Sequence, residues 1–263
     1  GGKAATDFNL FIRNNSENLV NTESCSRVAL FWSNATATHY STSVKETDFI
    51  QSSVSLGSDD EIKSNQSAAF YGMYDLLTRG HIQFDLIDET SFKTGQHKKY
   101  DTIIMSTAAC ISDEIATIVK DYVKEGGKLI SDFDTGLYNE LCEKREKSVL
   151  SEIQGIKSYV ETLKYPNGCG YLVNNKQSDV FDGVFDDNIA LPLLSIVNEF
   201  SEAAEVLGYA RKPLGGRYVD LAKETYPSVV YNKYGQGESI YFSGAIGECF
   251  DKYANPDWKK LVL

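Results

Sequence analysis

The chain has 263 residues, 42% of them hydrophobic and 24% charged, which is ordinary for a globular protein with enough core material for one large domain. Its formal net charge of -11 repels phosphate backbones and anionic lipid headgroups, so we expect neither nucleic acid nor a membrane as a partner. We also expect no signal peptide and no transmembrane span, because no long apolar run occurs.

The N-terminal residues 1–24 are expected to form a helical segment outside the main fold. Apolar side chains recur at helical spacing through residues 7–20, from Phe8 to Leu19. Residues 25–263 contain no internal repeat and no low-complexity linker, so we assign them to one compact domain.

The first half of that domain alternates predicted strands and helices. This order is typical of a doubly wound α/β fold, in which helices cover both faces of a mostly parallel sheet. The predicted elements are a strand at 27–33, a long surface loop at 34–63, a helix at 65–81, strands at 82–88 and 100–106, a helix at 112–127 and a strand at 128–133.

The second half gives weaker signals. We expect residues 147–190 to be irregular and residues 191–208 to form a helix or a buried apolar segment. Residues 226–244 alternate like a hairpin, with its turn at the glycines of 235–237, and Pro256 is placed to begin a last helix.

The stretch "EGGKLISDFDTGLYNE" runs from a predicted strand through an acidic turn into an expected helix. Many α/β enzymes hold a nucleophile at such a turn, and the residue at its apex here is Asp134. An aspartate nucleophile needs a histidine to activate water, and no histidine follows His97, which leaves His39 as the base. Cys110, after another strand, is the second candidate nucleophile, although its flanks favour a buried thiol.

Cofactor and metal motifs are missing from the sequence. No GxGxxG or GxxxxGK[ST] loop occurs, and the histidines have no partner at metal-binding spacing. Asp132 and Asp134 alone are too few ligands for an ion. We therefore expect no cofactor and no metal.

Five widely spaced cysteines lack any Cys-x-x-Cys pattern, which predicts free thiols in a reducing compartment and favours the cytoplasm. They are Cys25, Cys110, Cys142, Cys169 and Cys249.

A pocket is expected beyond the carboxyl ends of the strands, where ligands bind in open α/β sheets. The side chains predicted to lie there could bind a sugar, although core packing is the alternative for the tryptophan. They are Trp32, Asn34, Thr107, Asp134 and Thr135.

The segments "VALFWS", "AAFYGMYDLLTRGHIQFDLID" and "YDTIIMSTAACISDEIATIVKDYVKEGGKLISDFDTGLYNE" together resemble the class I glutamine amidotransferase-like fold. The chain is particularly similar to the β-galactosidase trimerisation domain that follows the catalytic barrel in family 42 glycoside hydrolases. Its closing hairpin and helix, in residues 226–260, also look like the end of that domain. The resemblance covers roughly residues 27–260.

This resemblance implies an accessory role. True amidotransferases carry a cysteine at the elbow and a later His-x-Glu, whereas this chain has Asp134 and no late histidine, so the elbow resembles a remnant. Residues 7–20 look like the last helix of an upstream barrel. The resemblance thus implies a non-catalytic, oligomerising domain, with a trimer and a catalytic barrel as partners. A stand-alone hydrolase or amidotransferase-like enzyme that uses Asp134 or Cys110, and a sugar-binding module, remain alternatives.

Overall fold

The computed structural model describes residues 2–40, 64–164, 170–191, 194–212 and 221–262. Its strands are β1 Val28–Phe31, β2 Phe84–Ile87, β3 Thr102–Met105, β4 Lys128–Asp132, β5 Ile156–Lys164, β6 Gly170–Val173, β7 Asn188–Leu191, β8 Leu194–Phe200, β9 Glu205–Arg211, β10 Thr225–Tyr234 and β11 Gly237–Phe242. Within these described residues, nine strands form one sheet in the order β2-β1-β3-β4-β11-β10-β9-β6-β7, and β5 pairs with β8 in a second sheet.

The large sheet is mixed, which corrects the expectation of a mostly parallel one. Neighbours from β2 to β11 are parallel, and those from β11 to β7 are antiparallel. Parallel neighbours need long connections that cross over the sheet. Such connections link the strands of the first half of the chain, and a long stretch of chain also separates β4 from its parallel neighbour β11. The predicted hairpin is confirmed, with Tyr234 of β10 opposite Gly237 of β11.

Helices cover both faces of the large sheet. They are α3 Asn34–His39, α4 Gln66–Arg79, α5 Glu89–Lys93, α6 Asp113–Lys124, α7 Ser151–Gln154, α8 Ile246–Tyr253 and α9 Pro256–Val262, with 3₁₀ turns η1 Gln96–Lys99 and η2 Asp179–Phe181. The long ones begin at side-chain caps: Asn65 accepts from the Ala68 amide at 3.1 Å, and Ser112 accepts from the Ile115 amide at 3.3 Å.

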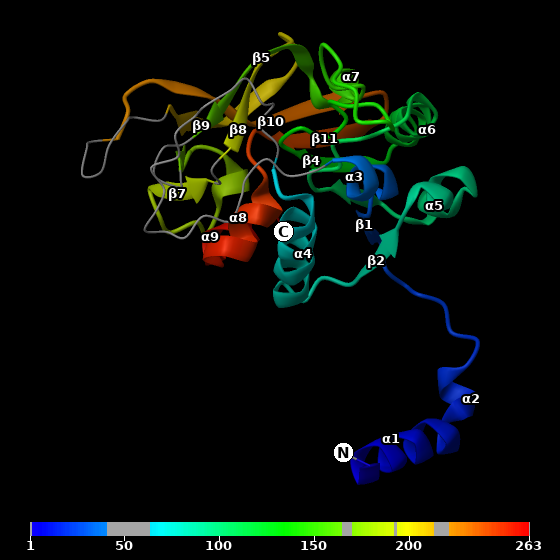
Figure 1. The fold of residues 1–263 in the computed structure, drawn as a ribbon. Coiled ribbons are helices and arrows are strands. Elements are labelled where there is room, and N and C mark those ends of the chain that lie inside the picture. The colour runs from blue at the N-terminus through cyan, green and yellow to red at the C-terminus, as the bar shows by residue number, and fades with distance from the viewer. Residues whose placement is uncertain (1, 41–63, 165–169, 192–193, 213–220, 263) are drawn as a thin grey trace.

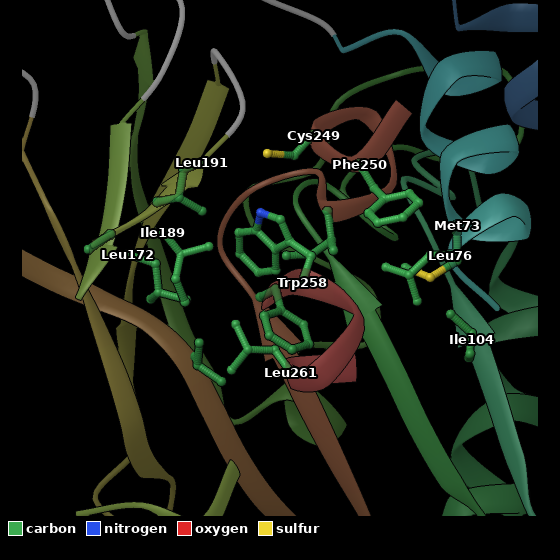
Figure 2. Packing of buried hydrophobic residues seen from close by; sticks show 14 of the residues in the cluster. Met73, Leu76, Ile104, Leu172, Ile189, Leu191, Cys249, Phe250, Trp258 and Leu261 are labelled. Carbon is green, nitrogen blue, oxygen red and sulfur yellow. The ribbon is translucent and has the colours of Figure 1, made fainter. Parts of the chain in front are cut away.

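One face of the sheet packs against α4, α8 and α9. Figure 2 shows Trp258 of α9 at the centre of this cluster, where its indole donates a 2.8 Å hydrogen bond to the carbonyl of Ala190. Helices α4 and α8 approach so closely that a Cβ added at Gly72 would collide with the backbone carbonyl of Gly247. Only glycine allows two backbones to lie this near one another.

The other face packs against α5, α6 and α7. Leu30 of β1 belongs to the first cluster, whereas its neighbours Ala29 and Phe31 belong to the second. Burial on both faces explains why this strand reads as a continuous apolar run rather than an alternating one.

Two expectations about irregular segments were wrong, and one alternative for a third segment was wrong. Residues 34–39 form α3 rather than loop, and residues 41–63 of that expected loop lie outside the described residues. Residues 147–190 hold α7, β5, β6 and most of β7. Residues 191–208 contain no helix where they are described, and β8 and the start of β9 occupy them. The alternative of a buried apolar segment holds for the start of β8, where Leu194 and Ile196 are buried.

The N-terminal segment forms helices α1 Gly2–Asn14 and α2 Ser16–Leu19, which extend away from the rest of the protein (Figure 1). No residue of either helix is buried, and the side chain of Phe8 is 63% exposed. In the part of the chain that the structure describes, no helix is both long and apolar enough to cross a membrane.

Candidate functional site

Asp132, the last residue of β4, holds together three elements at the carboxyl end of the parallel strands. Its Oδ1 accepts a 2.5 Å hydrogen bond from the amide of Thr107, which follows β3. Its Oδ2 accepts from the hydroxyl of Ser106 at 2.9 Å and from the amide of Ile246, the first residue of α8, at 3.0 Å. The carboxylate therefore ties β3 and β4 to the start of α8.

Burial is the main influence on the pKa of the Asp132 carboxyl. Desolvation raises the pKa of this carboxyl to about 6, although hydrogen bonds from Thr107, Ser106 and Ile246 oppose the shift. All three of these donors belong to the same chain, so their hydrogen bonds to the carboxylate stabilise the local structure.

Asp134 lies two residues further and is also buried. Its Oδ2 accepts a 2.5 Å hydrogen bond from the phenol of Tyr40, and the phenol oxygen accepts a 3.0 Å bond from the amide of Ser64. The Ser64 hydroxyl donates to Glu248 of α8, whose Oε2 also accepts from the Asn65 amide at 3.3 Å. This network links the loop after β4 to the residues before α4 and to α8.

Burial also raises the pKa values of two groups in this network. Desolvation, reinforced by Asp134, raises the pKa of the Tyr40 phenol, which keeps it protonated as a donor. Desolvation also raises the pKa of Glu248, although the hydrogen bond from Ser64 opposes it. Tyr40, Ser64 and Glu248 were not predicted from the sequence, because they come from distant segments with no shared motif.

The turn after β4 differs from the expected strand-turn-helix elbow. Residues 133–150 are described throughout and contain no helix; the next one is α7. The left-handed backbone conformation falls on Phe133, with φ of 46°, rather than on Asp134. The loop instead folds back along the end of β3, where the Tyr138 amide donates to the Ala109 carbonyl at 3.0 Å.

The space beside Asp134 is very small. A cavity of about 10 Å³, lined by Asp134, Thr135 and eight other residues, lies between the turn and the β5–β8 pair. This volume is close to that of a single water molecule and is far below the roughly 300 Å³ of a small-molecule site.

Among the described residues, the five predicted pocket residues have different surroundings. Asp134 and Thr135 line the small cavity, and Thr107 is buried beside Asp132. Trp32 packs edge-on against Phe70, with ring centroids 4.7 Å apart, and donates to Asn34. Asn34 is exposed and donates to Glu89 of α5 at 2.8 Å.

The other candidate catalytic residues, His39 and Cys110, lie at the same end of the sheet: the Cys110 amide donates to the Thr36 hydroxyl of α3 at 2.9 Å, and the helix ends at His39. His39 is exposed. Cys110 is buried, and its pKa is raised by desolvation and by the neighbouring Cys142 thiol, so it is a poor nucleophile. Within the described residues, no group of three acidic, cysteine or histidine side chains could hold a metal ion.

A larger hollow of about 590 Å³ lies at the opposite, amino-terminal end of the parallel strands. Its lining includes the rings of His97, Tyr100 and Tyr122, from η1, the start of β3 and α6. The phenol of Tyr100 donates to Asp85, and that of Tyr122 donates to the Tyr100 carbonyl. Because both phenol hydroxyls already donate hydrogen bonds within the protein, these two tyrosines offer a ligand mainly their ring surfaces.

Comparison with known proteins places this architecture among domains of glycoside hydrolases. Residues 27–252 match the family model described as the β-galactosidase trimerisation domain. No curated protein sequence matches the chain.

Solved structures share the fold. The β-galactosidase of Bacillus circulans sp. alkalophilus is 21% identical with a TM-score of 0.65, and the match covers 89% of this chain and 31% of that one. The α-L-fucosidase isoenzyme 2 of Paenibacillus thiaminolyticus is 18% identical with a TM-score of 0.64, covering 96% and 34%. The β-galactosidase of the haloarchaeon Halorubrum lacusprofundi is 14% identical with a TM-score of 0.59, covering 88% and 30%.

The chain thus spans about a third of the length of these enzymes. The family model, in contrast, covers most of this chain, from the first strand of the sheet to helix α8. The chain therefore belongs to the β-galactosidase trimerisation domain family.

Proposed function

We propose that this chain is a non-catalytic assembly domain of a glycoside hydrolase, which brings copies of the enzyme together and lies beside a catalytic barrel. The match of residues 27–252 to a trimerisation domain is the observation that carries this proposal. A trimer is the expected assembly. The parent enzyme acts on a glycoside, and its sugar is left open, since a fucosidase and β-galactosidases share this fold.

The chemistry at the strand ends supports the absence of catalysis. Asp132 accepts hydrogen bonds from three residues of its own chain, and Asp134 accepts one from Tyr40. A cavity of about 10 Å³ leaves no room for a sugar beside Asp134. In this proposal a carbohydrate meets the domain only from outside, at the edge of a cleft formed by the barrel.

A degenerate amidotransferase-like site is part of the proposal. The strand order β2-β1-β3-β4-β11 supports a doubly wound, flavodoxin-like core in the parallel half of the sheet. The strained position of a nucleophile elbow corresponds best to Phe133, with φ of 46°, and a phenyl ring has no nucleophilic atom. By this reasoning the elbow lost its nucleophile and Asp134 acquired a structural partner.

Helix α1 supports the proposed barrel contact. Phe8, Phe11 and Ile12 lie at helical spacing, and their side chains are 63%, 57% and 39% exposed. An amphipathic helix with no buried residue gains stability by packing its apolar side on another surface. We assign that surface to the upstream catalytic barrel. In the described part of the chain Cys25, Cys110, Cys142 and Cys249 form no disulfide bond, which supports a reducing, cytoplasmic setting.

Size-exclusion chromatography with light scattering tests the assembly role. We expect three times the mass of one chain, maintained on dilution. A monomer at every concentration would contradict self-association by this domain. Chain lacking residues 1–24 is the matched control: it should keep the same mass if the main domain alone makes the interface.

A glycosidase assay tests the absence of catalysis separately. We expect no hydrolysis of chromogenic β-galactosides, β-mannosides or α-L-fucosides by this chain. Hydrolysis that Asp134→Asn or Cys110→Ala abolishes would favour the alternative of an independent enzyme. Sugar binding by isothermal titration, lost in Trp32→Ala, would instead favour a sugar-binding module.

A further inference from the structure

Two cysteines that are distant in the sequence meet at the carboxyl end of the parallel strands. Cys110 lies between β3 and α6, and Cys142 lies in the loop after β4. Cys142 packs against the buried cluster that contains Cys110, and its thiol is near enough to raise the pKa of Cys110. Tyr40 and Tyr138 belong to the same cluster.

Hydrogen bonds fix the backbone on both sides of this contact. The Ile111 amide donates to the Tyr138 carbonyl at 3.0 Å, and the Tyr138 amide donates to the Ala109 carbonyl at 3.0 Å. The Arg145 amide then donates to the Leu137 carbonyl at 2.8 Å, closing the loop that carries Cys142. These backbone hydrogen bonds hold the segments that carry Cys110 and Cys142 side by side.

The position of Cys142 is unusual for a cysteine. Its φ of 65° lies in the left-handed region, which glycine and asparagine adopt more readily. A tight turn imposes this conformation, because the Asn139 side chain accepts hydrogen bonds from the amides of Leu141 and Glu143 at 3.0 and 2.9 Å. Turn geometry therefore does not explain a cysteine here, whereas its contact with Cys110 does.

We infer that Cys110 and Cys142 are a latent dithiol, which a low-molecular-weight disulfide oxidises to an intrachain disulfide bond. Cys142 is half-buried and reacts first: its sulfur attacks the small disulfide, forms a mixed disulfide and releases one small thiol. The sulfur of Cys110 then attacks Cys142 Sγ and expels the second small thiol, which takes the Cys110 proton. Two protein thiols are oxidised and one disulfide is reduced to two thiols.

The surroundings of Cys110 set the order of these steps. Cys110 is only 1% exposed, and burial together with the Cys142 thiol raises its pKa, so it stays protonated and out of reach of the reagent. The second step is therefore slow and should become faster as the pH rises. Once formed, the bond joins the segment after β3 to the loop after β4.

Peptide mapping of the full chain tests this inference. The protein is incubated with oxidised glutathione, blocked with an alkylating reagent, digested without reduction and analysed by mass spectrometry. We expect a peptide pair joined through Cys110 and Cys142, formed at least several-fold faster at pH 8.5 than at pH 7. Oxidation should also raise the Tm by several degrees, reversibly on reduction, because the bond constrains the unfolded chain.

Variants make the result decisive. Cys110→Ser and Cys142→Ser should each lose the linked pair and the rise in Tm. Cys249→Ser is the control and should retain both, because Cys249 packs in the separate cluster around Trp258, where its thiol donates to the Ala190 carbonyl. Glutathione that stays attached to Cys142 while Cys110 remains alkylatable would overturn the inference. So would linkage of either residue mainly to the exposed Cys25.

Discussion

The phenol of Tyr40 lies 2.5 Å from Oδ2 of Asp134, inside the protein. The side chain that the sequence places at the apex of a catalytic turn thus accepts a hydrogen bond from a residue 94 positions away. Tyr40 and Ser64 flank residues 41–63, so the contact joins the two described ends of that segment to the loop after β4.

Tyr40→Phe is expected to lower the free energy of unfolding by about 2 kcal/mol, because a hydrogen bond to a buried carboxylate contributes more than a neutral one. Urea unfolding followed by circular dichroism measures the change. Tyr231→Phe is the matched control, since the Tyr231 phenol donates to Glu238 at 2.9 Å close to solvent. An equal loss in both variants would contradict a special role for the Tyr40 contact.

Asp132 gives a prediction about pH. Its pKa in the folded protein is raised to about 6 from an ordinary 3.8, so the folded state holds this proton more tightly than the unfolded chain. The contribution of the group to stability is therefore fully present below pH 4 and is lost as the pH rises towards 6. This loss is at most about 3 kcal/mol.

Asp132→Asn cannot titrate, so the unfolding free energy of the wild type relative to this variant should fall between pH 4 and pH 7. Urea titrations at several pH values measure this difference. Asp187→Asn serves as the control, because the Lys176 ammonium lowers the pKa of the exposed Asp187 below its ordinary 3.8. The wild-type advantage over this variant is lost only below about pH 4, so it should stay nearly constant between pH 4 and pH 7. A wild-type advantage over Asp132→Asn that grows with pH would disprove the assignment.

Gly72→Ala should destabilise the protein by about 2 kcal/mol or more, because the added methyl group would force α4 away from α8. The obstacle is the backbone carbonyl of Gly247, which cannot rotate aside as a side chain could. Differential scanning calorimetry would show a lower Tm. Gly2→Ala is the control, since nothing lies within 4 Å of a Cβ built there.

Removal of residues 1–24 tests the division of the chain into a helical segment and a main domain. We expect the remaining domain to unfold cooperatively with a Tm within about 2 °C of the full chain, because α1 and α2 bury no residues. Thermal unfolding followed by circular dichroism checks this. A broad transition, or a Tm many degrees lower, would mean that the segment is part of the folded core.

The sequence predicted the parallel half of the sheet well because local signals agree there. Leu76 and Leu77 recur on the buried side of α4, and Gly126 follows α6 with a φ of 117°. Strands β1 and β3 are apolar runs bounded by polar residues, which is typical of strands covered on both faces.

The antiparallel half was harder to predict, for a physical reason. Strand β8 buries Leu194, Ser195 and Ile196 in succession, so it shows no alternation, and the Ala- and Glu-rich residues 202–205 favour a helix by propensity. Pairing with β5 decides the conformation of this strand, and such pairing is invisible to local patterns.

The candidate site was predicted only as a set of positions. The sequence places Asp132 and Asp134 correctly at the end of β4, but it cannot show that Thr107 and Tyr40 already donate hydrogen bonds to them. The partners of a buried carboxylate come from distant segments, so the distinction between a reactive and a structural acid depends on tertiary contacts.

The position of β11 has a consequence for how the protein is made. Among the described strands this one is synthesised last, yet it lies in the middle of the sheet, parallel to β4 and antiparallel to β10. Until residue 242 has been synthesised, β4 has an unpaired edge, and unpaired edges promote aggregation of nascent chains. The two halves of the sheet therefore join only after β11 has been synthesised, and a chain that stops before β11 leaves both halves with open edges.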